Sequence, residues 1–331
     1  MSHEKLKRRL VGPASAIITP LKKDQTLDKA GMRDNIKFML DHGFKDRRGW
    51  IIGPSPGGES PFMSMRERKE AMTVIADEVN GALPIQAGVH DNSFEAIVDL
   101  MRHAKDIGFD LVQLQPPWYH HTGAEEVYRF YEEVTDKVDI PVIIINNYWQ
   151  RTLDGAGMNE AVFERLSGIE NLVGVAWGSP NWYTYINSIR QFKDRFVFID
   201  NNWLGLGLFW GCTSFVEVLG QVYPEYTLGL YDVLRKGDYR KATEYLWKLT
   251  LPYYLWLGKV QGQGVHGEGP LIKATMWLAG KPAGPAKPPY DIGLTEAQLE
   301  ELRQVLIDGG VPKVKSTKDA LRAQLHSVRK R

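Results

Sequence analysis

Cysteine is almost absent from this chain of 331 residues, which contains only Cys212. A single thiol excludes an internal disulfide and a zinc centre built from cysteines. Long apolar runs are also lacking: none approaches the length of a membrane span, and none behind the charged N-terminus is long enough for a signal peptide. We therefore expect a protein of a reducing, cytoplasmic compartment.

An excess of charge of one sign is lacking as well, since the net charge is +1. This balance gives no electrostatic reason to expect nucleic acid or a membrane surface as a partner. The last residues, from Lys313 to Arg331, are locally basic. We interpret them as a solvated helix or tail in preference to a binding arm.

Short runs rich in valine and isoleucine alternate with amphipathic stretches. Most runs are nearly continuous in apolar character, as expected of parallel strands covered on both faces. The predicted strands are Ser15–Thr19, Gly49–Ile52, Pro84–Val89, Leu111–Leu114, Pro141–Ile145, Leu172–Ala176, Phe196–Ile199 and Ser214–Val218. Strand–helix repetition of this kind predicts an α/β protein whose eight βα units close into a (β/α)8 TIM barrel.

Helical periodicity fills the stretches between the runs and continues alone beyond them. The predicted helices are Leu27–His42, Arg66–Val79, Asn92–Ile107, Ala124–Val138, Asn159–Ser167, Trp182–Phe192, Tyr226–Arg235, Tyr239–Leu257, Gly269–Leu278 and Thr295–Asp308. Thr26, Ser64 and Thr295 are the expected N-caps, and Pro252 should kink or break its helix. The expected regions are an N-terminal extension over residues 1–12, a barrel over 13–225 and a C-terminal helical region over 226–331 packed on the barrel.

The order of short motifs along the chain resembles the dihydrodipicolinate synthase / N-acetylneuraminate lyase family. The matching segments are Thr19-Pro20, Gly58-Glu59-Ser60, Ala87-Gly88-Val89, Pro117-Trp118-Tyr119, Arg151-Thr152, Gly211 through Pro224, Lys273-Ala274 and Pro288-Pro289. The resemblance covers nearly the whole chain. It implies a TIM barrel, lyase chemistry through a lysine Schiff base with a keto acid, and a homo-oligomer, either a tetramer or a dimer.

Departures from this family fall on the positions that carry its chemistry. The segment from Asn171 to Ser179 has Ala176 where the resemblance implies the Schiff-base lysine, and Trp177 beside it. Asn146 stands where the family has its proton-relay tyrosine. An alanine has no nitrogen that can condense with a carbonyl, so we expect no imine at this position.

Polar residues cluster at or just after the predicted strand ends, where barrel active sites lie. The predicted catalytic residues are Asp200, Glu217, Asn146, Tyr119 and Glu59. The predicted substrate-binding residues are Arg151, Ser55, Gly57, Gly58, His90, His120, Asn147 and Trp177. Crowded carboxylates raise one another's pKa, which suits general acid/base catalysis, and Asp200 with Glu217 is the first choice for proton transfer. The alternative is that these carboxylates bind backbone amides or pair with Arg151.

Two further features leave alternatives open. Carboxylates with His90 or His120 could hold a divalent metal, although no ligand spacing supports one, and no other cofactor is expected. Tryptophans near the predicted loops, among them Trp177 and Trp203, either pack loops and subunits together or line a pocket for a bulky apolar group.

Three functions follow. The favoured one is a lyase of the aldolase, hydratase or decarboxylase type that acts without a lysine imine, by acid/base or metal-assisted chemistry. Its substrate would be a small carboxylate-bearing molecule, with an aromatic one as an option. The second is a non-catalytic relative that binds a small carboxylate. The third is an ordinary pyruvate-dependent imine lyase such as a dihydrodipicolinate synthase.

Overall fold

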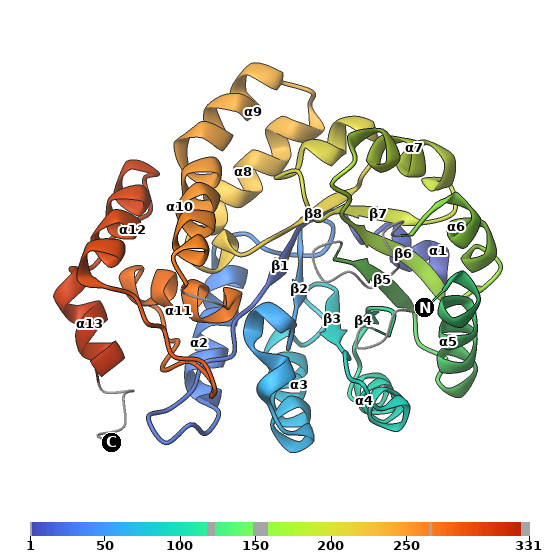
Figure 1. Cartoon of the computed structure of the whole chain (residues 1–331), viewed down its shortest axis with the longest axis horizontal. Coiled ribbons are helices and arrows are strands. Elements are labelled where there is room, and N and C mark those ends of the chain that lie inside the picture. Colours follow the sequence, from blue (N-terminus) through green and yellow to red (C-terminus); the bar gives the residue numbers. More distant parts are fainter. Residues whose placement is uncertain (1, 118–122, 148–157, 265–266, 326–331) are drawn as a thin grey trace. The chain divides into compact units, whose positions relative to one another are not determined.

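The computed structural model describes residues 2–117, 123–147, 158–264 and 267–325. Within them, eight parallel strands follow one another in chain order around a closed barrel (Figure 1). The strands are β1 (Gly12–Ala16), β2 (Trp50–Ile52), β3 (Ile85–Gly88), β4 (Leu111–Leu114), β5 (Val142–Asn146), β6 (Leu172–Trp177), β7 (Val197–Asp200) and β8 (Ser214–Glu217). The predicted (β/α)8 barrel is confirmed.

Helices alternate with these strands and continue beyond the last one (Figure 1). They are α1 (His3–Lys7), α2 (Lys29–Asp41), α3 (Met65–Val79), α4 (Phe94–Asp106), α5 (Ala124–Lys137), α6 (Glu160–Leu166), α7 (Trp182–Phe192), α8 (Pro224–Arg235), α9 (Tyr239–Tyr245), α10 (Leu251–Gly262), α11 (Glu268–Leu278), α12 (Glu296–Asp308) and α13 (Thr317–Leu325). The described part of the chain has no helix both long and apolar enough to cross a membrane.

The first strand begins and ends three residues earlier than predicted. The apolar run continues past Ala16, and Ile17 and Ile18 are both buried. The backbone N–H of Ile18, however, donates to the side-chain oxygen of Gln221 at 2.8 Å. A run can therefore remain extended and buried while a side chain replaces the neighbouring strand as its hydrogen-bond partner.

Two of the three predicted N-caps are confirmed, because Ser64 and Thr295 both form complete capping boxes. The prediction for Thr26 was wrong. Asp28 caps α2 by accepting from the backbone N–H of Gly31, while the Thr26 hydroxyl donates to Asp24. An aspartate closer to the helix satisfies the first turn more directly.

Pro252 does not break the long helix that contains it. A π-helical turn, η6 (Leu246–Thr250), follows α9 and leads directly into α10, whose second residue is Pro252. A proline has no backbone N–H and its ring crowds the carbonyl four residues earlier. That carbonyl belongs to Lys248, which lies in the wider π-helical turn. The extra width accommodates the proline ring, so the helix continues past Pro252.

The chain divides into two compact units. The first consists of Met1–Ala14, Lys45–Ile52 and Gly81–Glu217, and the second consists of Ser15–Phe44, Gly53–Asn80 and Val218–Arg331. The second unit therefore groups α2 and α3 with the C-terminal helices, so its boundaries cut across the three regions expected from the sequence.

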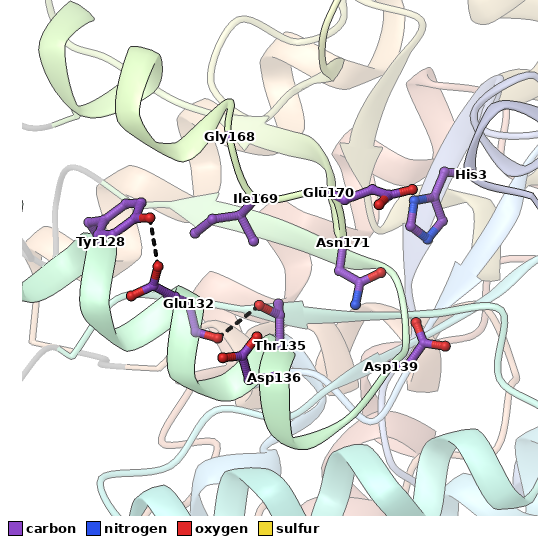
Figure 2. Close-up of a pocket in the computed structure, with 10 residues that line it drawn as sticks. All are labelled: His3, Tyr128, Glu132, Thr135, Asp136, Asp139, Gly168, Ile169, Glu170 and Asn171. Carbon is purple, nitrogen blue, oxygen red and sulfur yellow. Dashed lines mark hydrogen bonds between the residues drawn. The ribbon is translucent and has the colours of Figure 1, made fainter.

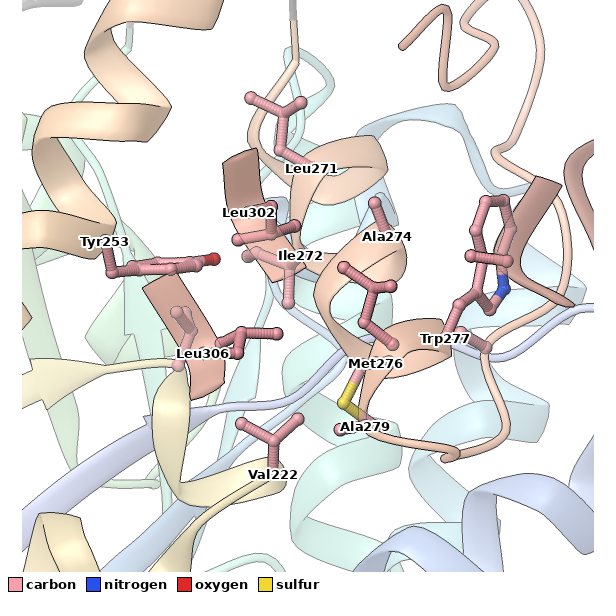
Figure 3. Close-up of a cluster of buried hydrophobic side chains, with 14 of the residues drawn as sticks. Val222, Tyr253, Leu271, Ile272, Ala274, Met276, Trp277, Ala279, Leu302 and Leu306 are labelled. Atoms are coloured by element: carbon pink, nitrogen blue, oxygen red, sulfur yellow. The ribbon is translucent and has the colours of Figure 1, made fainter. Parts of the chain in front are cut away.

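Helix α11 is the centre of the second unit. Every residue from Gly269 to Leu278 is buried. Figure 3 shows side chains of this helix among Tyr253 of α10, Leu302 and Leu306 of α12 and Val222. A helix that is buried on all sides has no amphipathic pattern. A polar side chain on such a helix is held in place by the residues packed around it.

Gly284 should be one of the least replaceable residues of the second unit. It has a φ of +68°, and a Cβ added to it would lie 1.7 Å from the carbonyl oxygen of Leu21. We expect Gly284→Ala to cost about 1–2 kcal/mol for the left-handed backbone and about 1–3 kcal/mol more for the overlap. Gly237→Ala is the matched control, with φ +70° and open space around the site. Urea unfolding of both variants measures the difference, and equal losses would contradict the prediction.

Candidate active site

The direction of the Ala176 side chain follows from its neighbour Trp177. The Trp177 ring lies against Phe163 of α6 and Tyr185 of α7, with ring centroids 5.2 and 6.5 Å away. Since helices cover the outside of a TIM barrel, Trp177 points outward. Successive side chains on a strand alternate between faces, so Ala176 points into the barrel.

The inner surface around Ala176 is apolar. In the strand register, Ala176 lies beside Ile145 of β5 and Ile199 of β7. The sequences of the eight strands, all of them described, contain no lysine. This wall of the barrel therefore presents hydrocarbon and no amine.

Two amide side chains lie on the inner surface of the preceding strands. Gln113 of β4 pairs with Ile143 of β5, which pairs with Gly174, two residues before Ala176. Gln113 therefore faces inward like Ala176, and Gln86 of β3 contacts it directly by donating to its side-chain oxygen at 2.6 Å. Both glutamines are buried.

These glutamines belong to a hydrogen-bonded series that we call the amide chain: Trp50, Gln86, Gln113 and His90. The indole N–H of Trp50 donates to the Gln86 oxygen at 3.2 Å. At the other end, the Gln113 nitrogen lies 3.5 Å from Nε2 of His90, whose Nδ1 accepts from the backbone N–H of Gln115 at 3.2 Å. The sequence analysis identified His90 but missed the other three. For the two glutamines the available signal was an amide inside an otherwise apolar strand.

Asp200 is enclosed by the loop that follows β7. One carboxylate oxygen accepts from the backbone N–H groups of Asn202 and Trp203, and the other accepts from those of Gly205 and Gly207, at 2.8–3.1 Å. Burial raises the pKa of Asp200, while these hydrogen bonds act to lower it. The geometry favours the alternative in which this carboxylate binds backbone amides.

Glu217 does not share the inner surface with Ala176. Asp200 pairs in register with Trp177 and with Phe215 of β8, and Glu217 lies two residues beyond Phe215. By strand alternation, Asp200 and Glu217 both belong to the outward side of their strands. The role in proton transfer predicted for Asp200 and Glu217 stays a prediction.

Asn146 and Asn147 connect the end of β5 to neighbouring loops. The Asn146 side chain donates to the carbonyl oxygen of Gly178 at 2.7 Å. The side-chain oxygen of Asn147 accepts from the Asn201 amide at 2.9 Å. Both residues are buried, so their present contacts hold the loops after β6 and β7 close to the end of β5.

The Ser55–Glu59 loop belongs to the second unit. The backbone N–H groups of Gly58 and Ser60 donate to the carbonyl of Ser55, and that of Glu59 donates to Pro56. The Ser55 hydroxyl caps the same turn. These amides are thus engaged within the loop itself, in which Ser55, Gly57 and Gly58 are the predicted substrate-binding residues.

Glu59 forms a buried ion pair with Lys273 of α11, whose side chain is fully buried. The other Glu59 oxygen accepts from the backbone N–H of Lys287 at 3.0 Å, and the Lys273 ammonium also donates to the carbonyl of Pro285 at 2.7 Å. Burial lowers the pKa of Lys273, and the attraction of Glu59 opposes this shift. The pair ties the loop and the C-terminal segment to α11.

Several predicted site residues lie outside the described part of the chain: Tyr119, His120 and Arg151. Their roles stay predictions. Among the residues that are described, no group of three or more histidines, cysteines and carboxylates is arranged to hold a metal ion.

A separate hollow of about 460 Å³ occurs in the first unit (Figure 2). Figure 2 shows carboxylates around it, including Glu132 and Asp136 of α5 and Glu170 in the turn before β6. Tyr128 donates to Glu132 across one side at 2.7 Å. Its residues precede β5 and β6, whereas the active sites of TIM barrels lie at the opposite, carboxyl ends of the strands.

Comparison with known proteins points to one family. A sequence model described as the dihydrodipicolinate synthetase family matches residues 9–307. The chain is 27% identical over 298 residues to a 4-hydroxy-tetrahydrodipicolinate synthase of Methanothrix thermoacetophila, covering 89% of this chain and 95% of that protein. It is 26% identical over 304 residues to an uncharacterized DapA-like lyase of Halobacterium salinarum, covering 91% and 95%.

Solved structures agree on the fold. Dihydrodipicolinate synthase from Aquifex aeolicus superposes with a TM-score of 0.79 at 22% identity, covering 93% of this chain and 100% of that one. The enzyme from Oceanobacillus iheyensis gives 0.80 at 22% identity, covering 92% and 98%. The protein is therefore a TIM barrel whose relatives are named as synthases and lyases. More particularly, it belongs to the dihydrodipicolinate synthetase family.

Replacing Asp200 tests whether its carboxylate is structural. In Asp200→Asn one oxygen becomes an NH2 group that faces two backbone N–H donors. We expect a loss of about 1–3 kcal/mol for each donor left unsatisfied, measured by urea unfolding. Asp194→Asn, at an exposed position, is the control. A catalytic role alone would leave the stability of Asp200→Asn unchanged.

Removing one member of the Glu59–Lys273 pair should be more damaging than removing both. Lys273→Met leaves Glu59 buried without its counter-charge, at a cost of about 3–5 kcal/mol. The double variant with Glu59→Gln should recover part of this loss. The exposed pair of Lys259 and Glu301 supplies the control, where Lys259→Met should cost less than about 1 kcal/mol. A double-mutant cycle by urea unfolding measures both pairs, and equal coupling in the two would refute the prediction.

Proposed function

We propose that this chain is a lyase of its family that acts on a small carboxylate-bearing substrate without forming a lysine imine. The observation that carries the proposal is Ala176. It stands on the inner face at the carboxyl end of β6, beside Ile145 and Ile199. Imine catalysis requires a primary amine at the reacting carbon, and a methyl group cannot supply one.

The substrate class rests on the relatives. Two of them carry the names 4-hydroxy-tetrahydrodipicolinate synthase and DapA-like lyase. One solved structure, the dihydrodipicolinate synthase of Acinetobacter baumannii, is described as a complex with pyruvate. Pyruvate is therefore the first probe to test with this chain.

Lyase chemistry next to a carbonyl requires a place for negative charge to develop. An imine provides it in one kind of mechanism, and hydrogen-bond donors aimed at the carbonyl oxygen provide it in another. Two side chains of the inner surface, Gln113 and Gln86, carry such N–H groups, and this supports the second kind. These side chains are neutral, and a buried neutral group is stable when it belongs to a hydrogen-bonded network.

A non-catalytic function is the second candidate. Two of the predicted catalytic carboxylates have structural partners: Asp200 accepts four backbone hydrogen bonds, and Glu59 pairs with Lys273. A protein that only binds a small carboxylate would tolerate both arrangements. Mass spectrometry of products from a panel of hydroxy and keto acids separates the two functions.

Reduction with borohydride tests the absence of an imine. We expect wild-type protein mixed with pyruvate and borohydride to gain no covalent adduct by intact-mass spectrometry. Ala176→Lys is the positive control, since it restores an amine at the end of β6 and should give an adduct. Ala176→Met adds bulk without an amine and should give none. A wild-type adduct that maps to any lysine would show an ordinary imine lyase.

A further inference from the structure

We propose that a hollow in the second unit binds a small organic anion with a flat apolar body, such as an aromatic carboxylate. The hollow measures about 600 Å³, and we call it the lysine pocket. It is lined by the loop after β1, the end of α11, the connector from Gly280 to Pro285 and the residues around the start of α13. These segments all belong to the second unit. The pocket therefore shares no residue with the wall around Ala176 and does not depend on the proposed function.

The charge of the pocket comes from lysine side chains. The lysines that line it are Lys22, Lys23, Lys281 and Lys315. Within the described residues, no carboxylate forms an ion pair with any of these ammonium groups. Lys259, on another surface, is by contrast paired with Glu301 at 2.8 Å. The lining lysines thus remain available to a negative group from outside the chain.

The carboxylates of the lining already have partners. Asp28 accepts from the backbone N–H of Gly31 as the N-cap of α2. Asp319 accepts from the hydroxyl of Ser316 at 2.9 Å. Two carboxylates against four ammonium groups leave the pocket positively charged. This balance favours an anion over a neutral or cationic ligand.

Lys281 is the lysine with the most defined surroundings. Its ammonium lies over the ring of Phe38, 2.8 Å from the ring centroid, and its backbone N–H donates to the carbonyl of Met276 at 2.8 Å. Burial lowers the pKa of Lys281 to about 8, the attraction of Glu225 opposes this shift, and repulsion from Lys313 adds to it. A bound anion would stabilise this half-buried ammonium.

Trp277 supplies an apolar wall that carries one hydrogen-bond donor. The residue is 6% exposed, and Figure 3 shows its ring at one side of α11. None of the described residues accepts from its indole N–H, and that nitrogen is not completely covered. The uncovered part of the indole therefore faces the pocket that Trp277 lines. A ring can pack against the indole while an oxygen accepts from its N–H.

Backbone contacts hold the walls of the pocket in place. The N–H of Leu21 donates to the carbonyl of Ala283 at 3.0 Å, which joins the loop after β1 to the connector. The N–H of Lys315 donates to the carbonyl of Leu278 at 2.7 Å, which joins the segment before α13 to the end of α11. A site whose walls are already fixed loses little conformational entropy when a ligand binds.

The indole signal of Trp277 is the first measurement. In protein labelled with nitrogen-15 at tryptophan, the signal is assigned with Trp277→Phe. We expect benzoate, which has both a ring and a charge, to shift it with saturation. Acetate lacks the ring and benzamide lacks the charge, so each should bind about tenfold more weakly or worse. No shift with benzoate, or equal affinity for benzamide, would overturn the proposal.

Removing single charges is the second measurement, with the Trp277 signal as the readout. Lys281→Gln should weaken benzoate about tenfold, corresponding to one lost hydrogen bond between charged groups, whereas Lys281→Arg keeps the charge and should retain most of the affinity. The exposed Lys315→Gln should weaken binding about threefold. Lys259→Gln, the same change outside the pocket, should have no effect. Equal affinity in Lys281→Gln and wild type would refute the proposal.

The double variant Lys22→Gln with Lys23→Gln provides an independent route if Lys281→Gln does not fold. Both side chains are exposed on the loop after β1, so the substitutions should leave the fold intact. We expect benzoate to bind about fivefold more weakly. An unchanged affinity would contradict the pocket, because benzoate that shifts the Trp277 signal from another site would not respond to these charges.

Discussion

Strand alternation in a closed barrel decides which residues of this protein can reach a substrate. Each strand sends successive side chains to opposite sides, and helices cover the outer side. At the end of β6 this rule directs Trp177 into the helical layer, where it packs against Phe163 and Tyr185, and leaves Ala176 facing inward. The register then extends the same division to Ile145, Ile199 and the strands beyond them.

Buried carboxylates and buried neutral amides have different kinds of partner in this protein. A buried charge must be paired or fully hydrogen-bonded, and two carboxylates near strand ends meet this requirement through structural contacts, Asp200 with four backbone amides and Glu59 with Lys273. Burying a neutral amide such as Gln86 or Gln113 costs less free energy than burying a charge. Each amide needs hydrogen-bond partners but no counter-charge. Gln86 and Gln113 therefore give the barrel interior hydrogen-bonding groups that require no counter-ion.

The sequence predicted the fold well because the fold depends on local signals. Apolar runs located the strands, and Ser64 and Thr295 located two helix starts. The predicted end of the first strand was wrong because a contact distant in sequence determines it. The backbone N–H of Ile18 donates to the side chain of Gln221 instead of to a neighbouring strand. The site was harder, since a residue next to a strand end faces either the pocket or the helices, and a shift of one position reverses the answer. Trp177 was therefore assigned to the substrate, while the glutamines inside the strands were overlooked.

Replacing an imine with hydrogen bonds restricts the substrates that such a site can process. A covalent iminium carries a full positive charge on the atom that receives the electrons, whereas one hydrogen-bond donor contributes a factor of about 10²–10³ in rate. Neutral donors therefore suit a substrate whose own structure already stabilises the developing anion, such as a second carbonyl or an aromatic ring conjugated with it. A simple keto acid would bind but react slowly. On this argument binding and turnover should separate across a substrate series, with turnover rising as the carbon acid becomes stronger.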